Sequence, residues 1–405
     1  MRVGLMGVHC DNANLGVVAL AYSAVGLLHR VVPGEAEVVL FSANRQSELD
    51  RMAEVLGVRN KRFWAAPLYR RKPAVLMQSL ADMRRCDVVL DFTGGDSFSD
   101  IYGARRLVNK LLDKQLVLAC GVPLLLAPQT YGPFQRRALL PWVRHVLNRA
   151  TLVAARDDLS GSFLAELTRR EVIAATDVAV TLPWQPGLFD LPDTDLPRVG
   201  FNVSGLLWNG GYTGDNQFRL RADYRQYCHD VIEGMLAGGF QVHLVPHVIS
   251  RGDAGREDDA AAARQLLAEY SDCVLAPPFT TPVEAKSYIS RLDAFLGSRM
   301  HATIAAFTTG VPTIPVAYSR KFAGFYQGLG YPIVVDLTEL ATTAASRISL
   351  GYVHDRGRLA ELVAAGRLRA DDRIAVFTNR LAEWLSGQAS GVAPAVSLDT
   401  KQSPA

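Results

Sequence analysis

Short apolar segments rich in β-branched residues alternate with segments of helical periodicity from the first residues of this 405-residue chain. Such apolar segments are typical of buried strands, and those of the first half are Val3–Val8, Val38–Phe41, Asp87–Phe92, Pro123–Ala127 and Leu152–Ala155. The helical patterns between or after them are Leu15–Arg30, Gln135–Asn148 and Asp157–Arg169. Alternating strands and helices predict a parallel sheet with helices on both faces.

A proline-rich stretch at 181–198 interrupts this pattern and predicts a domain boundary. Beyond it the predicted strands are Val199–Val203, Gln241–Val245, Ala294–Gly297 and Thr313–Val316, and the predicted helices are Phe218–Ala237, Arg256–Ser271 and Arg299–Thr308. We therefore expect an α/β protein with two Rossmann-like doubly wound domains, 1–190 and 197–350, that face a central cleft. C-terminal helices are expected within 351–388, at Arg358–Ala365 and Asp371–Leu385, and a disordered tail over 389–405.

The composition excludes several classes of protein. With 43 Lys and Arg against 40 Asp and Glu, the net charge of +3 does not indicate a nucleic-acid partner, whereas an anionic small molecule is compatible with it. The five cysteines have no CxxC spacing, which argues against disulfides or zinc, and no other cluster predicts a metal site. The sequence carries no signal for an oligomeric state.

Neither a membrane span nor a signal peptide is expected. The longest apolar run, Leu116–Ala127, is about half of the roughly 20 residues that a span needs. The first residues also contain polar groups where a signal peptide has an apolar core. We expect a cytoplasmic protein, and this is compatible with peripheral association through an acceptor held at a membrane.

Ligand-binding residues are expected where strands end, because doubly wound domains bind ligands at that edge of the sheet. In the loop after the first strand, Asn12 and Asn14 are polar candidates and Asn14 is predicted to cap the next helix. Gly16 follows and allows a ligand to approach the backbone closely. A simple turn with a helix cap explains the same residues.

Two further loops of the first domain carry polar candidates. After the strand that ends at Phe92, Gly94 and Gly95 allow a tight turn, and the carboxylates of Asp96 and Asp100 suit sugar hydroxyls or base catalysis, or else cap a helix. Past the strand that ends at Ala127, Gln129 and Tyr131 are candidates for hydrogen bonding and stacking with a saccharide. An ordinary turn would use the neighbouring Gly and Pro in the same way.

The second domain offers a candidate anion site where a strand ends at Gly297 and a helix begins. Ser298 is the predicted N-cap; the helix start favours an anion, and Arg299 adds a bidentate partner. His301 brings an imidazole, the common side chain whose unperturbed pKa lies near neutrality, which suits proton transfer. The alternative is a buried histidine bonded to backbone and an arginine in a structural salt bridge.

A second pair of cations follows the next predicted strand of the same domain. Arg320 and Lys321 are expected at the same edge of the sheet as Arg299, so that two loops converge on one anion. A solvated basic turn is the alternative, since Lys and Arg are mostly exposed.

Together these segments resemble the polysaccharide pyruvyl transferase family over most of the chain, up to about Tyr331. The matching segments are Asn12 to Gly16, Thr-Gly-Gly-Asp-Ser-Phe-Ser-Asp (93–100), Ala-Pro-Gln-Thr-Tyr-Gly-Pro (127–133), Ala-Arg-Asp-Asp-Leu-Ser (155–160), Phe-Asn-Val-Ser-Gly-Leu (201–206) and Gly-Ser-Arg-Met-His-Ala (297–302). The chain departs from the family in three places: the first loop has no acidic residue after its Gly, Ala-Pro-Gln replaces the usual Gly-Gln-Gly, and Trp208–Asn216 is an extra loop.

The resemblance implies a GT-B-like fold and a pyruvyltransferase. Such an enzyme moves the pyruvyl group of phosphoenolpyruvate onto two hydroxyls of a sugar in a polysaccharide, cell-wall glycan or glycolipid, forming a pyruvate ketal and releasing phosphate. Phosphoenolpyruvate is a co-substrate, and no cofactor is implied. Two alternatives stay open: a nucleotide-sugar-dependent glycosyltransferase of the same fold, and a saccharide-binding protein without activity.

The resemblance implies that the stretch Arg299, Met300 and His301 of the second domain binds the donor, and Ser298 precedes it. Because the donor carries a carboxylate and a phosphate, we also expect cations from Arg320 and Lys321, with Arg156 of the first domain as a further candidate. His301 is the expected general acid–base, and Asp96 or Asp100 assists the acceptor hydroxyl. The remaining first-domain candidates are expected to hold the acceptor sugar.

Overall fold

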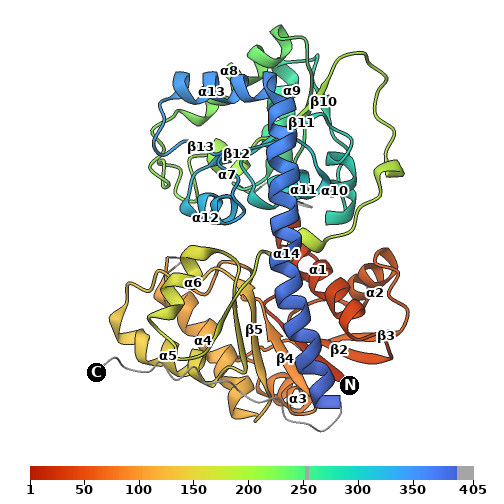
Figure 1. Ribbon diagram of the computed structural model, residues 1–405, viewed down its shortest axis with the longest axis vertical. Coiled ribbons are helices and arrows are strands. Elements are labelled where there is room, and N and C mark those ends of the chain that lie inside the picture. The colour runs from red at the N-terminus through yellow and green to blue at the C-terminus, as the bar shows by residue number, and fades with distance from the viewer. Residues whose placement is uncertain (102, 251–254, 390–405) are drawn as a thin grey trace. The chain divides into compact units, whose positions relative to one another are not determined.

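The computed structural model describes residues 1–101, 103–250 and 255–389 and divides them into two compact units, each built on one parallel sheet (Figure 1). Unit 1 comprises Met1–Asp11, Leu20–Thr181 and the chain from Asp372; unit 2 comprises Asn12–Ala19 and Leu182–Asp371. The predicted class, two doubly wound α/β domains, is confirmed.

The sheet of unit 1 contains seven parallel strands in the order β3-β2-β1-β4-β5-β6-β7. The strands are β1 Arg2–Met6, β2 Ala36–Leu40, β3 Lys61–Ala65, β4 Val88–Asp91, β5 Leu124–Gln129, β6 Leu152–Ala155 and β7 Val172–Ala174. The helices are α1 Leu15–Val31, α2 Gln46–Val55, α3 Pro73–Arg84, α4 Ala104–Ala119, α5 Leu140–Arg149 and α6 Asp158–Ala165, with 3₁₀ turns at Arg137–Leu139 and Val178–Thr181. The strand order reverses between β1 and β4, which is where such sheets bind ligands.

Apolar side chains of the strands and of the helices that cover them form a core of unit 1. Leu124 and Leu126 of β5 are fully buried in it, as are Leu107 and Leu111, which are one helical turn apart on α4. Sequence analysis missed β3 and β7: Lys61–Ala65 carries two basic residues, and β7 has only three residues. Short or charged edge strands give a weak apolar pattern.

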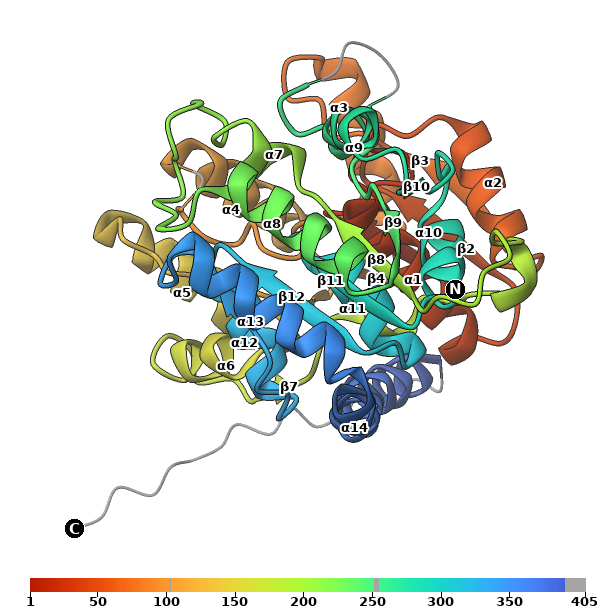
Figure 2. The ribbon, with the colours of Figure 1, turned by 90° about the horizontal axis from the view of Figure 1, so that it is seen from above.

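The sheet of unit 2 has six parallel strands in the order β10-β9-β8-β11-β12-β13. The strands are β8 Arg198–Asn202, β9 Gln241–Leu244, β10 Val274–Leu275, β11 Ala294–Gly297, β12 Thr313–Ala317 and β13 Val335–Asp336. The helices are α7 Gly205–Trp208, α8 Tyr224–Ala237, α9 Asp259–Glu269, α10 Pro282–Ile289, α11 Met300–Thr309, α12 Arg320–Gly328, α13 Thr342–His354 and α14 Arg356–Ala389, with a 3₁₀ turn at Pro186–Leu188. In Figure 2, α8 and α13 run side by side over this sheet.

Helix α8 begins six residues later than the apolar pattern suggested. Asp223 is its N-cap, and the carboxylate accepts hydrogen bonds from the N–H groups of Arg225 and Gln226. Upstream, Asn216 and Arg219 have positive φ, which interrupts any helix through that segment. An acidic cap therefore determines where the helix starts.

The first loop of the chain packs in unit 2 rather than with the sheet that it follows. The N–H of Leu15 donates to the carbonyl of His247 at 3.0 Å, and the N–H of Ile249 donates to that of Ala13 at 2.8 Å. Leu15 also belongs to the apolar core around Phe295. Helix α1 thus begins in unit 2 and continues, from Leu20, in unit 1.

Helix α14 is one continuous helix where two were predicted. Gly366 lies between the two predicted pieces, yet it does not break the helix. A Cβ at this position would lie 2.5 Å from the Phe307 ring, so glycine allows α14 to approach that ring closely. The same helix passes from unit 2 into unit 1 at Asp372, where Arg373 pairs with Asp158.

Two other predictions concern the chain ends and membranes. Most of the tail predicted for 389–405 lies outside the described residues. Of the described helices, α14 included, none combines the length and the apolar character needed to cross a bilayer.

Gly7, just after β1, is predicted to be intolerant of substitution. Its φ is +74°, and a Cβ would lie 2.3 Å from the backbone nitrogen of Thr93, which cannot move without shifting the next loop. Gly7→Ala should lower the free energy of unfolding, measured with urea, by about 2–5 kcal/mol, combining left-handed strain with overpacking.

Gly26→Ala is the matched control, because Gly26 is inside α1 and a Cβ there would meet nothing within 4 Å. Alanine should raise the free energy of unfolding by about 0.5–1 kcal/mol. Equal effects of the two substitutions would contradict this account of the β1 loop.

Candidate functional site

The carboxylate of Asp259, the first residue of α9, connects the strand ends of unit 2. It is completely buried and accepts hydrogen bonds from the N–H of Gly205 at 2.8 Å, of His247 at 3.1 Å and of Val248 at 3.0 Å. Gly205 follows β8, and His247 and Val248 follow β9. A buried charge needs such partners, so one carboxylate fixes two loops.

Arg299 binds the same carboxylate after β11. Its Nη2 lies 2.9 Å and its Nε 3.1 Å from Oδ1 of Asp259, and Nη2 also donates to the carbonyl of Glu257 at 2.8 Å. Burial alone would lower the pKa of Arg299, but the Asp259 carboxylate offsets it and the pKa is raised. Among the described residues Nη1 has no hydrogen-bond partner, so the guanidinium is held rigidly with one nitrogen left for a ligand.

The predicted N-cap at Ser298 is wrong. Arg299 occupies the N-cap position of α11, without a capping side-chain bond. The hydroxyl of Ser298 instead accepts a hydrogen bond from Tyr224 at 2.9 Å, while the Asn202 side chain accepts from the N–H of Arg299 at 2.9 Å. Because the Ser298 hydroxyl is bonded to the buried Tyr224, it does not cap the helix. The first N–H groups of α11 therefore donate no capping bond to an N-cap side chain.

His301, in the first turn of α11, lies directly against Gly16. A Cβ on Gly16 would stand 2.6 Å from Nδ1 and 2.8 Å from Cγ of the imidazole. Oδ1 of Asn14 accepts a hydrogen bond from the N–H of Gly16 at 2.9 Å, which confirms Asn14 as the N-cap of α1. Asn12 in turn accepts the N–H of Asn14 at 2.9 Å. The first loop, predicted on the acceptor side, therefore adjoins the candidate donor residues of unit 2.

His247 completes this cluster and was not a predicted site residue. Burial lowers the pKa of His247 to about 3, and its electrostatic interactions with His301 and Arg299 act in the same direction. An imidazole in this place is neutral at any pH near 7.

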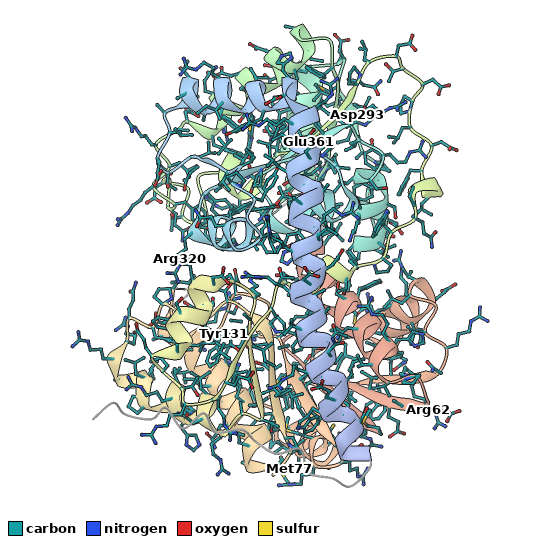
Figure 3. The ribbon with its side chains drawn as sticks, viewed as in Figure 1. Arg62, Met77, Tyr131, Asp293, Arg320 and Glu361 are labelled. Carbon is teal, nitrogen blue, oxygen red and sulfur yellow. The ribbon has the colours of Figure 1, made fainter. Side chains whose placement is uncertain are left out.

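Arg320 and Lys321 begin α12, after β12 (Figure 3 labels Arg320). The side chain of Arg320 is exposed, and the Lys321 ammonium lies 5.5 Å from the ring centre of Tyr318. Tyr318 itself interacts electrostatically with Arg299. The two cations are therefore on the strand end next to Arg299, as predicted from the sequence.

The extra loop 208–216 also belongs to this region. Burial raises the pKa of Tyr212, and the nearby Glu257 carboxylate, to which its hydroxyl bonds, raises it further. The carbonyl of the same Glu257 accepts a hydrogen bond from Arg299, so Glu257 connects the loop 208–216 to the guanidinium. Gly210, Gly211 and Gly214 all have positive φ, which lets the loop turn back on itself.

In unit 1 the loop after β4 is strained and held by a buried ion pair. Thr93, Gly94 and Gly95 have φ values of +47°, +66° and +83°, and positive φ is costly for a β-branched threonine. The ammonium of Lys114 lies 2.7 Å from the Asp91 carboxylate and 2.8 Å from the Thr93 hydroxyl, all buried. These contacts fix the loop in its conformation.

The other first-domain candidates support this loop or its neighbours. Gln129, fully buried, donates to the Asp91 carbonyl at 3.0 Å. Tyr131 is equally buried, and burial followed by the Asp91 charge raises its pKa. Asp100 accepts the N–H of Arg136 at 2.7 Å and does not cap α4. Asp96 is partly buried at the same loop.

Arg156, a predicted donor ligand, is engaged inside unit 1. Its Nη1 donates to Asp177 at 2.6 Å and its Nε to the Thr130 hydroxyl at 2.7 Å. Burial would lower the pKa of Arg156, but the Asp177 carboxylate raises it. A Cβ on Gly95 would stand 3.0 Å from Nη1, so Arg156 lies close to the strained loop after β4.

Two residues of this site were missed because their signals are ambiguous in the sequence. Asp258-Asp259 is a helix-start signal, and only the first of the two carboxylates caps α9. His247 lies in the loop after the buried strand β9, and no sequence motif marks it. Across the parts of the chain that the structure describes, no three His, Cys, Asp or Glu side chains are arranged to hold a metal.

Several solved structures have a similar architecture. Anabaena HepE, solved in complex with UDP and glucose, aligns with 96% of this chain and 100% of its own at a TM-score of 0.55 and 14% identity. A putative UDP-N-acetylglucosamine 2-epimerase of Listeria monocytogenes aligns over 98% of both chains at a TM-score of 0.60 and 10% identity. At such identities the likeness shows the fold alone: an α/β protein of the GT-B-like class.

Sequence comparison identifies the family within that class. The polysaccharide pyruvyl transferase family matches residues 14–320, and the chain belongs to this family. The amylovoran biosynthesis protein AmsJ of Erwinia amylovora is 22% identical over 284 residues, which are 64% of this chain and 63% of AmsJ. The matching region of this chain thus spans less than two thirds of that relative.

Removing the charge of Asp259 should unfold the site, because Arg299 would keep a buried and unpaired charge. Asp259→Asn is expected to lower the free energy of unfolding by roughly 3–5 kcal/mol, measured by urea denaturation. The control is Asp355→Asn: Asp355 lies 3.8 Å from Arg358, both are more than half exposed, and the loss should stay below about 1 kcal/mol. A similar small loss in both variants would contradict the role of Asp259.

Proposed function

We propose that this protein transfers the pyruvyl group of phosphoenolpyruvate onto two hydroxyls of a saccharide in polysaccharide synthesis, with release of phosphate. The observation that carries the proposal is the start of α11: a guanidinium fixed by Asp259, uncapped N–H groups of a helix and an imidazole two residues on. Helix starts and guanidinium groups both bind carboxylate and phosphate. The family and the polysaccharide-related name of AmsJ support the substrate class.

The charges of unit 2 suit a donor with two anionic groups. Asp259 neutralises part of the Arg299 charge, so Arg299 serves as a rigid hydrogen-bond donor through Nη1 more than as a net cation. The exposed Arg320 and the neighbouring Lys321 supply the additional positive charge at the next strand end. A carboxylate and a phosphate on three carbons fit these two clusters.

The reaction needs one proton delivered to carbon and two taken from hydroxyls. His301 gives a proton to the methylene carbon, which leaves an oxocarbenium-like centre at C2. One hydroxyl adds to C2, the bond from C2 to the phosphate oxygen breaks, and the second hydroxyl closes the ketal. Of the two hydroxyl protons, one restores His301 and the other leaves with phosphate. In unit 1, Asp96 or Asp100 is proposed to assist the acceptor near the loop after β4.

A nucleotide-sugar glycosyltransferase is the competing function. It would need a carboxylate for the ribose hydroxyls in unit 2. The Asp259 carboxylate already accepts hydrogen bonds from five protein groups: the N–H groups of Gly205, His247 and Val248, the Asn202 amide and the Arg299 guanidinium. The Glu284 carboxylate accepts from the backbone N–H and the hydroxyl of Thr280. Neither of these two carboxylates is available for a ribose.

The proposal is tested by phosphate release from phosphoenolpyruvate with a panel of saccharide acceptors. Release should depend on the acceptor, and NMR of the product should show one new methyl group on a ketal carbon for each phosphate. Turnover that depends on a UDP-sugar, with phosphoenolpyruvate inert, would overturn the proposal in favour of the glycosyltransferase. Binding of phosphoenolpyruvate without turnover on any acceptor would also overturn it.

Substitutions at the His301–Gly16 contact should affect the chemical step. His301→Ala is expected to lower kcat by roughly 10²–10⁴-fold, the usual contribution of a general acid–base. Gly16→Ala should lower kcat by about 10²-fold with little change in KM for the donor, because the new methyl group displaces the imidazole. Gly26→Ala in the same helix is the control and should keep the wild-type kcat. A wild-type kcat in Gly16→Ala would show that the His301 imidazole does not take part in the reaction.

A further inference from the structure

The side chain of His247 is unusual for a protein interior, because its buried ring makes no hydrogen bond to any described residue. It is 2% exposed, and among the described residues neither Nδ1 nor Nε2 has a hydrogen-bond partner. A neutral imidazole carries one N–H donor and one acceptor, and burying both without partners is unfavourable. Native proteins satisfy most such groups, so the exception calls for a physical reason.

His243, four residues earlier on β9, shows how the same unit satisfies a structural histidine. It is also buried, but Nδ1 lies 2.6 Å from the Tyr288 hydroxyl and Nε2 lies 2.9 Å from Oε1 of Gln241. Both ring nitrogens are bonded within the protein. The contrast indicates that His247 is not a packing residue of the same kind.

The backbone of His247 is fixed on both sides by the candidate site. Its N–H donates to Asp259, which holds Arg299, and its carbonyl accepts from Leu15, the neighbour of Gly16. Gly16 in turn contacts His301. His247, Arg299 and His301 are therefore held around the start of α11 by one connected set of contacts. Because the His247 ring stays neutral there, it is able to donate a hydrogen bond without adding charge.

We propose that His247 is a donor-binding residue: its neutral N–H hydrogen-bonds an anionic oxygen of the bound donor, and this bond forms only when the ligand is present. The inference rests on the proposed function for the identity of the donor, phosphoenolpyruvate. The unfilled hydrogen bond keeps the free site ready for an anion, at a cost to the stability of the free protein. Neutrality also leaves His301 as the imidazole that exchanges protons.

The test compares His247→Leu with His243→Leu in two measurements, thermal stability of the free protein and affinity for an anion. Leucine at 247 removes two unsatisfied polar atoms and nearly conserves volume, so the melting temperature should stay equal or rise. Its affinity for phosphoenolpyruvate, from the ligand-induced rise in melting temperature, should fall at least tenfold. His247→Gln keeps an N–H and should recover part of the affinity.

His243→Leu is expected to behave in the opposite way. It breaks two internal hydrogen bonds, so the melting temperature of the free protein should fall while the affinity of the folded protein for phosphoenolpyruvate stays within about twofold of wild type. The inference is overturned if His247→Leu lowers the melting temperature as His243→Leu does, or if it binds phosphoenolpyruvate with wild-type affinity.

Inorganic phosphate and UDP, titrated in parallel, separate this inference from the proposed function. If UDP stabilises the wild-type protein and phosphoenolpyruvate does not, the proposed donor is wrong, and a loss of UDP affinity in His247→Leu still supports the role of His247. If phosphoenolpyruvate binds but no acceptor releases phosphate, the transfer fails while the binding role is supported by the same loss. A wild-type protein that none of the three anions stabilises overturns the inference.

Discussion

The buried ion pair between Asp259 and Arg299 is the interaction on which the organisation of unit 2 depends. The carboxylate accepts N–H groups from the segments after β8 and β9, and the guanidinium follows β11. Three neighbouring strand ends are thereby joined through one buried charge. Such a pair adds little net stability compared with apolar packing, but it fixes geometry, and a fixed guanidinium binds an anion with little loss of side-chain freedom.

Around this pair the site is assembled from segments far apart in the chain. Residues 12–19, which follow the first strand of unit 1, pack in unit 2 and place Gly16 against His301. The close contact gives a physical reason for a glycine in the first turn of α1. It also means that the first loop of the chain lies directly against the His301 imidazole.

In unit 1 the loop at the equivalent edge of the sheet is fixed by different contacts. The loop with positive φ at Thr93, Gly94 and Gly95 is held by the buried Lys114–Asp91 pair, and Arg156 lies close to Gly95. Two residues that the sequence predicted to bind ligands, Gln129 and Arg156, have side chains bonded within unit 1 near this loop. The backbone of the loop is therefore a rigid feature at this edge of the sheet.

The sequence by itself determined the fold class, most strands and the position of Arg299 and His301, because apolar periodicity and strand–helix alternation are local signals. It also carried the family resemblance, which follows from the order of short motifs. Short or charged strands such as β3, and the continuity of α14 through Gly366, depend on packing against distant residues and were not predictable. Only the tertiary structure decided that Asp259 binds Arg299, that Arg156 faces Asp177 and that His247 lacks partners within the described chain, because hydrogen bonds between buried groups are set by which strand ends become neighbours.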